Sequence, residues 1–379
     1  MILSLFTLKP NIIQEFKNKD KLMADFFLKN DTQSAIEAQY EAQKIAFAPV
    51  VFQVARAMRD FGILKLLQKN SKNGLLFKEI VNAVDLDEYG VKILLETSLS
   101  ANIVKKTSDK YYITKTGYFL QNDELVNINM DFNHYVNYKG LYHLDESLKS
   151  STPVGLHNSF GNDCDTIYPK LSTLPQKAKE SWFNFDHFYS DNALDKAVNI
   201  LLNMSPSKIL DIGGNTGKFS VKISKKNENI KTTIADLPQQ ITLAKTNIKA
   251  LNLENQIDFF TTDILDHTIS LPSGFDIVWL SQFLDCFKEE DIVNILKRCK
   301  KALGENGKIC IMEPIWDKQE FETSAFCIIN TSPYFTAMAN GYSKMMNSDD
   351  IKLYINKAGL KIVNEIDNVG ICQSIIICN

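Results

Sequence analysis

The 379-residue sequence lacks an excess of basic residues, paired cysteines and clustered metal ligands. Its 42 Lys and Arg against 45 Asp and Glu give a formal net charge of −3, so no global positive field draws the chain to nucleic acid. The seven cysteines are scattered, odd in number and free of C-x-x-C pairs, which excludes a disulfide framework and favours reduced thiols. Because no His and carboxylate residues cluster in the sequence, we expect no metal site.

Long apolar runs are also missing. No segment approaches the roughly 20 apolar residues that cross a bilayer, so we expect no membrane partner. The first eight residues are apolar but interrupted by Ser4 and Thr7, with no basic region before them and no small-residue cleavage site after them. We therefore expect no signal peptide and a cytoplasmic protein. The composition is that of an ordinary globular protein, and the length of the chain is sufficient for two domains.

A glycine-rich turn at residues 209–217 is the most informative feature that is present. The segment reads Ile-Leu-Asp-Ile-Gly-Gly-Asn-Thr-Gly, a short strand running into a bend. A dinucleotide fingerprint starting at Gly213 needs glycines where Asn215 and Lys218 stand. Asp211 would repel a pyrophosphate but suits a ligand with cationic groups and hydroxyls, such as S-adenosylmethionine (SAM). The alternative for this segment alone is an ordinary strand–turn–helix corner.

Strand and helix patterns alternate from residue 206 onwards, which is typical of a parallel sheet. The sequence predicts a Rossmann-like α/β domain over 206–379 that ends in an antiparallel hairpin formed by 361–366 and 373–378. The other predicted strands are 208–212, 232–236, 257–261, 275–280 and 308–313.

The front of the chain is predicted to be mainly α-helical. We expect a winged-helix domain over 1–121 and a helical connection over 122–205 that contributes to the substrate pocket. Its elements are helices up to about residue 68, over 76–84 and over 89–103, then a β-wing from 110–114 and 118–120. Residues 77–106 contain four lysines against five acids. This balance opposes DNA binding and favours a packing or dimerisation role.

Two acids follow predicted strands at the edge where α/β folds bind ligands. Asp236 lies 19 residues beyond Gly217 and is placed to accept hydrogen bonds from a ribose diol, or else to cap the helix beginning at Pro238. Asp263 is placed to meet an adenine amino group with Ile264 against the ring, or is a loop acid. The expected cofactor contacts are Asp211, Gly213, Gly214, Gly217, Asp236, Leu237, Asp263, Ile264, Ser281 and Gln282.

The reactive end is less defined. Asp285 follows the fourth strand, where it is either a general base or an acid at a helix N-terminus. Residues 184–190, which include His187, mix aromatic and polar side chains and suit a lid or an interdomain core. Aromatic residues and Met suit a flat apolar acceptor, although for any single one of them the pattern favours plain core. The expected acceptor contacts are Tyr135, Trp182, Phe326, Phe335 and Met338, with Tyr138, Tyr334 and Tyr342 nearby.

Together these motifs resemble class I SAM-dependent methyltransferases. The resemblance rests on Asp211-x-Gly-Gly-x-x-Gly217, residues 235–239 (Ala-Asp-Leu-Pro-Gln), residues 262–264 (Thr-Asp-Ile) and the final hairpin. The winged-helix front half narrows it to the small-molecule O-methyltransferases that include plant caffeate and bacterial polyketide enzymes. The likeness covers roughly residues 35 to 379. It implies SAM as cofactor, methyl transfer to a hydroxyl of a small aromatic molecule, and a homodimer formed through the N-terminal domain.

One departure from that family concerns the base. The family stretch Leu-Lys-x-x-Leu-His-Asp-Trp reads Leu-Ser-Gln-Phe-Leu-Asp-Cys-Phe at 280–287, so Asp285 stands where the catalytic histidine is expected. The family's acid after the fifth strand corresponds to Glu313. We predict Asp285 as base or as the group that orients the hydroxyl, with Glu313 and His187 in reserve. The alternatives are carbon or nitrogen methylation, another SAM reaction, or a non-catalytic SAM-sensing regulator.

Overall fold

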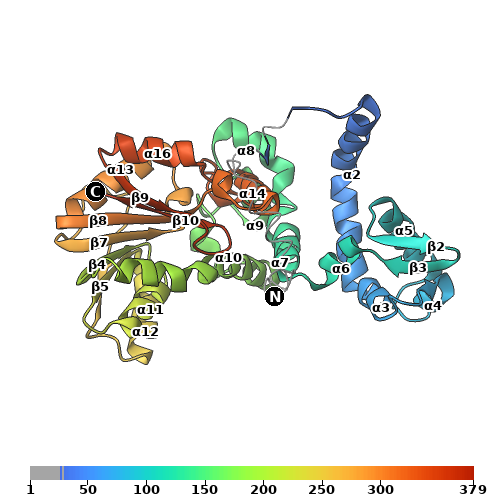
Figure 1. Cartoon of the computed structure of the whole chain (residues 1–379), viewed down its shortest axis with the longest axis horizontal. Helices are drawn as coiled ribbons and strands as arrows, with labels where there is room; N and C mark the ends of the chain where they lie inside the picture. The colour runs from blue at the N-terminus through green and yellow to red at the C-terminus, as the bar shows by residue number, and fades with distance from the viewer. Residues whose placement is uncertain (1–25, 28–29) are drawn as a thin grey trace, which may run out of the picture. The chain divides into compact units, whose positions relative to one another are not determined.

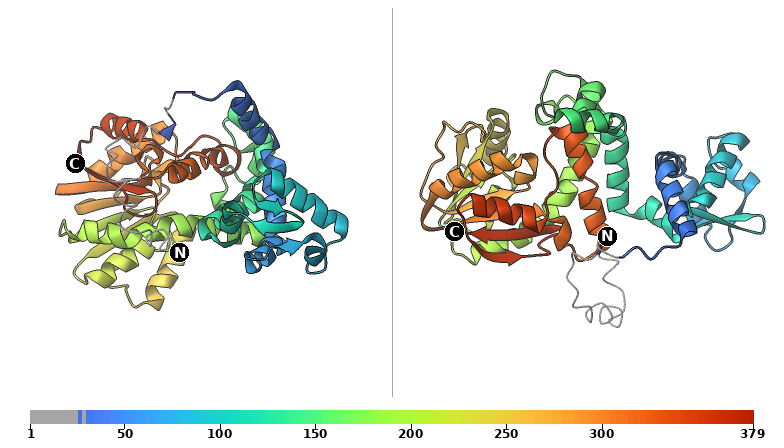
Figure 2. Two further views of the ribbon diagram at one scale, coloured as in Figure 1. Left: turned by 45° about the vertical axis from the view of Figure 1, so that its right-hand side comes forward. Right: turned by 90° about the horizontal axis from the view of Figure 1, so that it is seen from above.

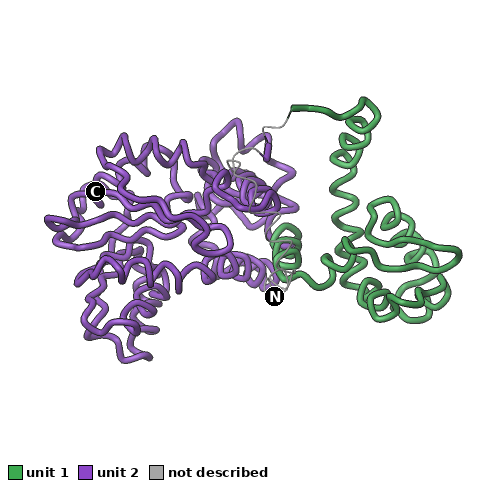
Figure 3. The backbone as a smooth tube through the Cα atoms, in the orientation of Figure 1, with its two compact units in different colours: residues 1–21, 28–134 green, residues 22–27, 135–379 purple. Residues whose placement is uncertain are grey.

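The computed structural model describes residues 26–27 and 30–379, which fall into two compact units (Figure 3). Of the described residues, unit 1 comprises 30–134 and unit 2 comprises 26–27 and 135–379. Most of the helix expected over residues 1 to about 45 lies outside the described residues. The first eight residues, on which the expectation of no signal peptide rests, also lie outside them. Within the described residues that helix begins at Ala35, because Ser34 caps it through a reciprocal contact with Glu37.

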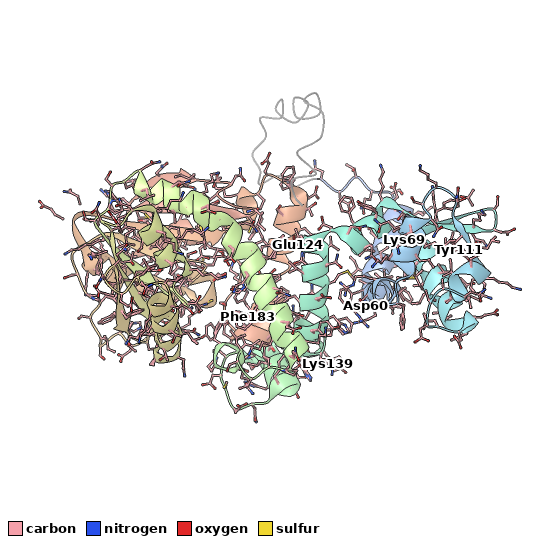
Figure 4. All side chains as sticks on the ribbon, turned by 90° about the horizontal axis from the view of Figure 1, so that it is seen from below. Asp60, Lys69, Tyr111, Glu124, Lys139 and Phe183 are labelled. Carbon is pink, nitrogen blue, oxygen red and sulfur yellow. The ribbon has the colours of Figure 1, made fainter. Side chains whose placement is uncertain are left out.

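Unit 1 is a helical domain with a small sheet. Helix α2 (Ala35–Asp60) is separated from α3 (Ile63–Lys69) by Gly62, whose φ of 76° only glycine adopts readily. Its apolar core includes Met58, Leu64 and Leu95, and Tyr111 is labelled on its sheet in Figure 4. The remaining elements are β1 (Leu75–Leu76), α4 (Phe77–Val81), α5 (Glu88–Ser100), β2 (Val104–Thr107), β3 (Lys110–Ile113), α6 (Lys115–Asn122) and α7 (Glu124–Phe132).

The predicted wing was wrong in its second strand. Residues 118–120 lie in helix α6, because the Thr114 side chain accepts a hydrogen bond from the Gly117 amide and starts a helix there. The strand that pairs with β3 is β2, which comes directly after α5. The β-branched and aromatic residues of the region suggested strands, but the cap at Thr114 decided the local structure.

Unit 2 is built on a seven-stranded sheet of order β6-β5-β4-β7-β8-β10-β9. The five strands from β6 to β8 are parallel, and β10 pairs antiparallel with both β8 and β9. The predicted Rossmann-like sheet with a terminal hairpin is therefore confirmed. The strands are β4 (Lys208–Ile212), β5 (Lys231–Asp236), β6 (Ile257–Thr261), β7 (Phe275–Ser281), β8 (Leu303–Pro314), β9 (Ile362–Ile366) and β10 (Gln373–Cys378).

Helices cover both faces of this sheet (Figure 1 and Figure 2, left). One core packs α13 (Glu289–Ala302) and α16 (Ser348–Lys357) on the sheet, and another packs α10 (Gln176–Leu202) and α11 (Lys218–Lys226) on the opposite face. Helix α12 (Pro238–Ala250) packs beside α11. No helix among the described residues is long and apolar enough to cross a bilayer.

Shorter helices gather at one end of unit 2, where the parallel strands finish (Figure 1). They are η4 (Gly140–His143), α8 (Leu144–Ser150), α9 (Val154–Phe160), η5 (Tyr168–Lys170), α14 (Glu322–Ile329), α15 (Ser332–Tyr334) and η8 (Phe335–Ala339). This end carries the loops of the candidate site, as the carboxyl edge of an open α/β sheet does in general.

Candidate active site

The strand order reverses between β4 and β7, and the loops that follow these two strands meet there. Gly213, directly after β4, has a φ of 69°. A Cβ on this residue would lie 2.3 Å from the ring of Phe283 in the loop after β7. Glycine is thus required both by backbone conformation and by the close approach of the two loops. Such a reversal opens a crevice for ligands beyond the strand ends.

Asp211 lies beneath the glycine-rich turn. Its carboxylate is buried and accepts a hydrogen bond of 2.7 Å from the Ser220 hydroxyl of α11. Burial raises the pKa of this carboxyl to about 7. A Cβ on Gly214 would come within 2.8 Å of its Oδ2, so the turn folds tightly over the acid. In this structure Asp211 supports the shape of the turn from below.

Asp236 joins the end of β5 to the same turn. Its Oδ2 accepts a hydrogen bond of 2.8 Å from the Asn215 amide, and its Oδ1 accepts one of 2.7 Å from the Leu237 amide. Leu237, not Asp236, is the N-cap residue of α12. Each carboxylate oxygen has a second lone pair, which leaves capacity for the two hydroxyls of a ribose.

The third expected contact region follows β6. Asp263 is exposed and its Oδ1 accepts a hydrogen bond of 2.9 Å from the Leu265 amide, which shapes a tight turn. Ile264 is buried in the core beneath the sheet edge. The structure therefore brings the ends of β4, β5 and β6 to one edge, as the spacing of these residues predicts.

The loop that carries Asp285 is held in place by Glu313 at the end of β8. Glu313 Oε1 accepts hydrogen bonds from the amides of Phe283 (3.0 Å) and Leu284 (2.8 Å). Ser281 ends β7, and Gln282 follows in the left-handed conformation with a φ of 46°. Non-glycine residues in that region are strained and occur often at functional sites. Glu313 thus acts on the backbone of this loop.

Asn340 holds the other end of the same loop. Its Nδ2 donates to the Cys286 carbonyl (2.9 Å) and to the Ser343 hydroxyl (2.8 Å). Its Oδ1 accepts hydrogen bonds of 3.0 Å from the amides of Tyr342 and Ser343. Both anchors are buried, so Asp285 sits in a short helix, η6 (Leu284–Cys286), fixed at both ends.

The Asp285 carboxyl is 6% exposed. Burial raises its pKa to about 6, and the Cys286 thiol donates to its Oδ1 at 3.5 Å. Burial, together with the charge of Asp285, raises the pKa of Glu313 well above its ordinary value, since two buried carboxyls cannot easily ionise together. Burial also keeps the Cys286 thiol and the Tyr168 phenol neutral by raising both pKa values. Within this loop, Asp285 is therefore a buried group with a pKa close to neutral pH.

Helix α10 brings aromatic and acidic side chains toward Asp285. Trp182 Nε1 donates a hydrogen bond of 2.7 Å to the Tyr334 hydroxyl of α15. Asp186, one turn further along α10, interacts electrostatically with Asp285, and burial raises its pKa to about 6. His187 is exposed and its ring lies 5.9 Å from that of Phe183, which Figure 4 labels on α10.

The expected acceptor residues lie in different settings. Phe335 is buried and its ring centroid lies 5.3 Å from that of Tyr334. Met338 is fully buried, and its sulfur fills the space beside Gly140. Phe326 is 58% exposed on α14. Tyr135 and Tyr138 lie at the start of the segment 135–379 of unit 2. Trp182 and Phe335 are thus grouped around Tyr334.

Sequence reasoning overlooked Asp186, Tyr168, Cys286 and Asn340 as members of this cluster. Asp186 stands four residues after Trp182, a spacing that places both on one helix face and could have identified it. Tyr168 and Asn340 come from segments without regular periodicity, so only the tertiary fold brings them to the loop that carries Asp285 and Cys286.

The residues at this edge fit SAM. A glycine turn with a left-handed Gly213 gives a ligand close access to backbone, and the Asp236 carboxylate at the end of β5 has lone pairs suited to a ribose diol. Among the described residues no group of three or more His, Cys, Asp and Glu is arranged to hold a metal ion.

Comparison with known proteins agrees with this geometry. Residues 39–111 match the model of a dimerisation2-like domain, and residues 188–360 match that of an O-methyltransferase domain. The chain is 26% identical over 270 residues to the L-tyrosine C(3)-methyltransferase of Streptomyces lavendulae, covering 70% of this chain and 72% of that protein. It is 23% identical over 303 residues to O-methyltransferase 7 of Dictyostelium discoideum, covering 79% and 84% respectively.

The fold is also that of a solved methyltransferase. The crystal structure of the SAM-dependent methyltransferase SibL in its apo form superposes with a TM-score of 0.68 at 19% identity, covering 89% of this chain and 97% of that one. With the strand order, the glycine turn and the two matched domains, the chain belongs to the SAM-dependent methyltransferases that carry an O-methyltransferase domain.

Proposed function

We propose that this methyltransferase transfers a methyl group to the hydroxyl of a small aromatic molecule. The observation that carries the proposal is the buried Asp285, held at the switch point of the sheet with a pKa near 6. A phenol has a pKa near 10 and is mostly protonated at neutral pH, so a base within reach accelerates its reaction. Because burial raises the pKa of the carboxyl, the difference between the pKa values of the base and the phenol becomes smaller.

The remaining parts of the site support this chemistry. SAM supplies an electrophilic methyl group. Asp285 accepts the phenolic proton, Glu313 and Asn340 keep its loop in one conformation, and Trp182 and Tyr334 present aromatic surface for a flat acceptor. Because an oxygen nucleophile needs chiefly correct alignment at short distance, a rigid loop is more useful here than elaborate proton transfer.

Turnover on a panel of acceptors tests the proposal. Purified protein is incubated with SAM and phenols, catechols or host-cell extract, and S-adenosylhomocysteine (SAH) and methylated products are detected by mass spectrometry. We expect SAH formation with at least one phenol and a methyl signal on oxygen by NMR. SAM binding without turnover on any acceptor would contradict the proposal.

Methylation of a ring carbon beside the hydroxyl is the second candidate. It is favoured by Asp285 in place of the family histidine and by the likeness to an L-tyrosine C(3)-methyltransferase. Removing the phenolic proton activates the adjacent carbon as well as the oxygen, so the same base serves either outcome. The NMR position of the methyl group in the panel product distinguishes the two.

We propose further that the protein forms a homodimer through unit 1. This unit matches a dimerisation2-like domain, and one face of α2 carries exposed apolar side chains at helical spacing, with Ile36 80%, Tyr40 57% and Phe47 59% exposed. Exposed apolar patches of this kind mark interfaces. We expect twice the chain mass by analytical ultracentrifugation, and a monomer at all concentrations tested would refute this.

The seven free thiols suit the reducing cytoplasm, where we place the enzyme.

A further inference from the structure

One face of α10 presents a carboxylate to the acceptor side of the site. Trp182, Asp186 and Tyr189 follow one another at spacings of four and three residues, which aligns them on one face of the helix. Asp186 is partly buried and has neither a hydrogen-bond nor an ion-pair partner within the described residues. Burial raises the pKa of this carboxyl, and a carboxylate that is partly withdrawn from water and has no partner is stabilised by a cationic ligand.

The charged neighbours of Asp186 leave this carboxylate unmatched. They are His187, Lys218, Asp285 and Asp191. The Lys218 ammonium lies 3.0 Å from both oxygens of Asp191, so its charge is already paired. His187 is exposed to solvent.

A second, independent observation is that Asp285 and its neighbour Glu313 are also incompletely satisfied. Glu313 is 1% exposed and its Oε2 is buried with no hydrogen-bond partner in the described structure. Asp285 is 6% exposed, and within the described part of the chain its carboxylate accepts one weak side-chain hydrogen bond, from the Cys286 thiol. The acceptor side therefore holds more anionic hydrogen-bond capacity than the chain itself pairs.

We propose that the methyl acceptor is a phenol that also carries a protonated amine, with Asp186 binding the ammonium group and Asp285 facing the reacting hydroxyl. Tyr334 interacts electrostatically with both Asp186 and Asp285 and accepts a hydrogen bond from Trp182. Aromatic rings of this kind attract a cation through their faces. This inference rests on the proposed function and adds the substrate's charge to it. An acceptor without a cation would leave the partly buried Asp186 carboxylate without a compensating charge.

Equilibrium binding by calorimetry in saturating SAH tests the proposal without requiring turnover. The probes are tyramine and 4-propylphenol, which share the phenol and the chain length and differ in the amine. We expect tyramine to bind the native protein at least about tenfold more tightly. In Asp186→Asn this preference is expected to fall below about threefold because tyramine binding weakens while 4-propylphenol binding stays the same.

Asp195→Asn is the matched control. It removes an acid from the same helix, where Asp195 pairs with Lys222 at the surface, and should keep the preference for tyramine. Titration with SAH and with SAM confirms that Asp186→Asn is folded and shows which ligand the carboxylate serves. Weaker binding of either by the variant would assign Asp186 to the cofactor and overturn the proposal.

The other outcomes are also decisive. Equal affinity of the native protein for both probes, or a preference that survives in Asp186→Asn, overturns the inference and leaves the proposed function standing. If neither phenol binds the native protein with SAH present, the proposed function fails together with it.

Discussion

Replacing Asp285 by Asn is expected to lower kcat by about 100-fold or more while leaving SAH affinity unchanged, because general base catalysis typically contributes a factor of this size. The amide keeps the shape of the side chain but cannot accept the phenolic proton. Initial rates with the best acceptor from the panel measure the effect. A loss below about threefold with intact SAH binding would remove Asp285 from the role of base.

The pH dependence gives the same residue a second test. Burial raises the pKa of the Asp285 carboxyl to about 6, so the group is ionised and able to accept a proton above that value. We expect kcat/KM of the native enzyme to fall as the pH drops below about 6, and Asp285→Asn to lack this limb. Asp258→Asn, a change at an exposed acid of β6, should retain the native profile.

Replacing Asp236 by Ala is expected to weaken SAH binding by about tenfold to 100-fold, since hydrogen bonds to a charged group contribute about 1.5–3 kcal/mol each. The variant loses the acceptor for the ribose diol and also the contacts to the Asn215 and Leu237 amides. Isothermal titration with SAH measures the change. Asp236→Asn, which keeps one carbonyl oxygen, should fall between the native protein and the Ala variant.

Asp276→Ala separates ligand binding from loop support. Asp276 Oδ2 accepts hydrogen bonds from the Ser207 (2.7 Å) and Lys208 (2.9 Å) amides, a comparable pair of backbone contacts at the start of β7. It lies at the opposite edge of the sheet from the candidate site. An SAH affinity in Asp236→Ala that matches that of Asp276→Ala would argue against a ribose contact.

Local sequence signals determined the α/β half of this protein. The sheet was predicted from apolar strands that alternate with amphipathic helices and from the glycine turn at Asp211–Gly217. The hairpin was predicted from the two apolar segments at the end of the sequence. The structure confirms both. These features work because strand burial, helix periodicity and glycine conformation are set by residues close together in the chain. The prediction of a second wing strand was wrong because a different local signal prevailed. The capping residue Thr114 starts a helix and outweighs the strand preference of its neighbours.

Only the tertiary structure determines which residues meet on the acceptor side and how their pKa values shift. The sequence placed Asp285 after the fourth strand and showed that it replaces a histidine, but its pKa depends on burial and on Glu313, which lies 28 residues away. Asp186 of α10 interacts electrostatically with Asp285, and Asn340, from the segment after η8, donates a hydrogen bond to the neighbouring Cys286 carbonyl. Desolvation and charge coupling arise from groups that are neighbours in space but distant in sequence, and so no local pattern reveals them.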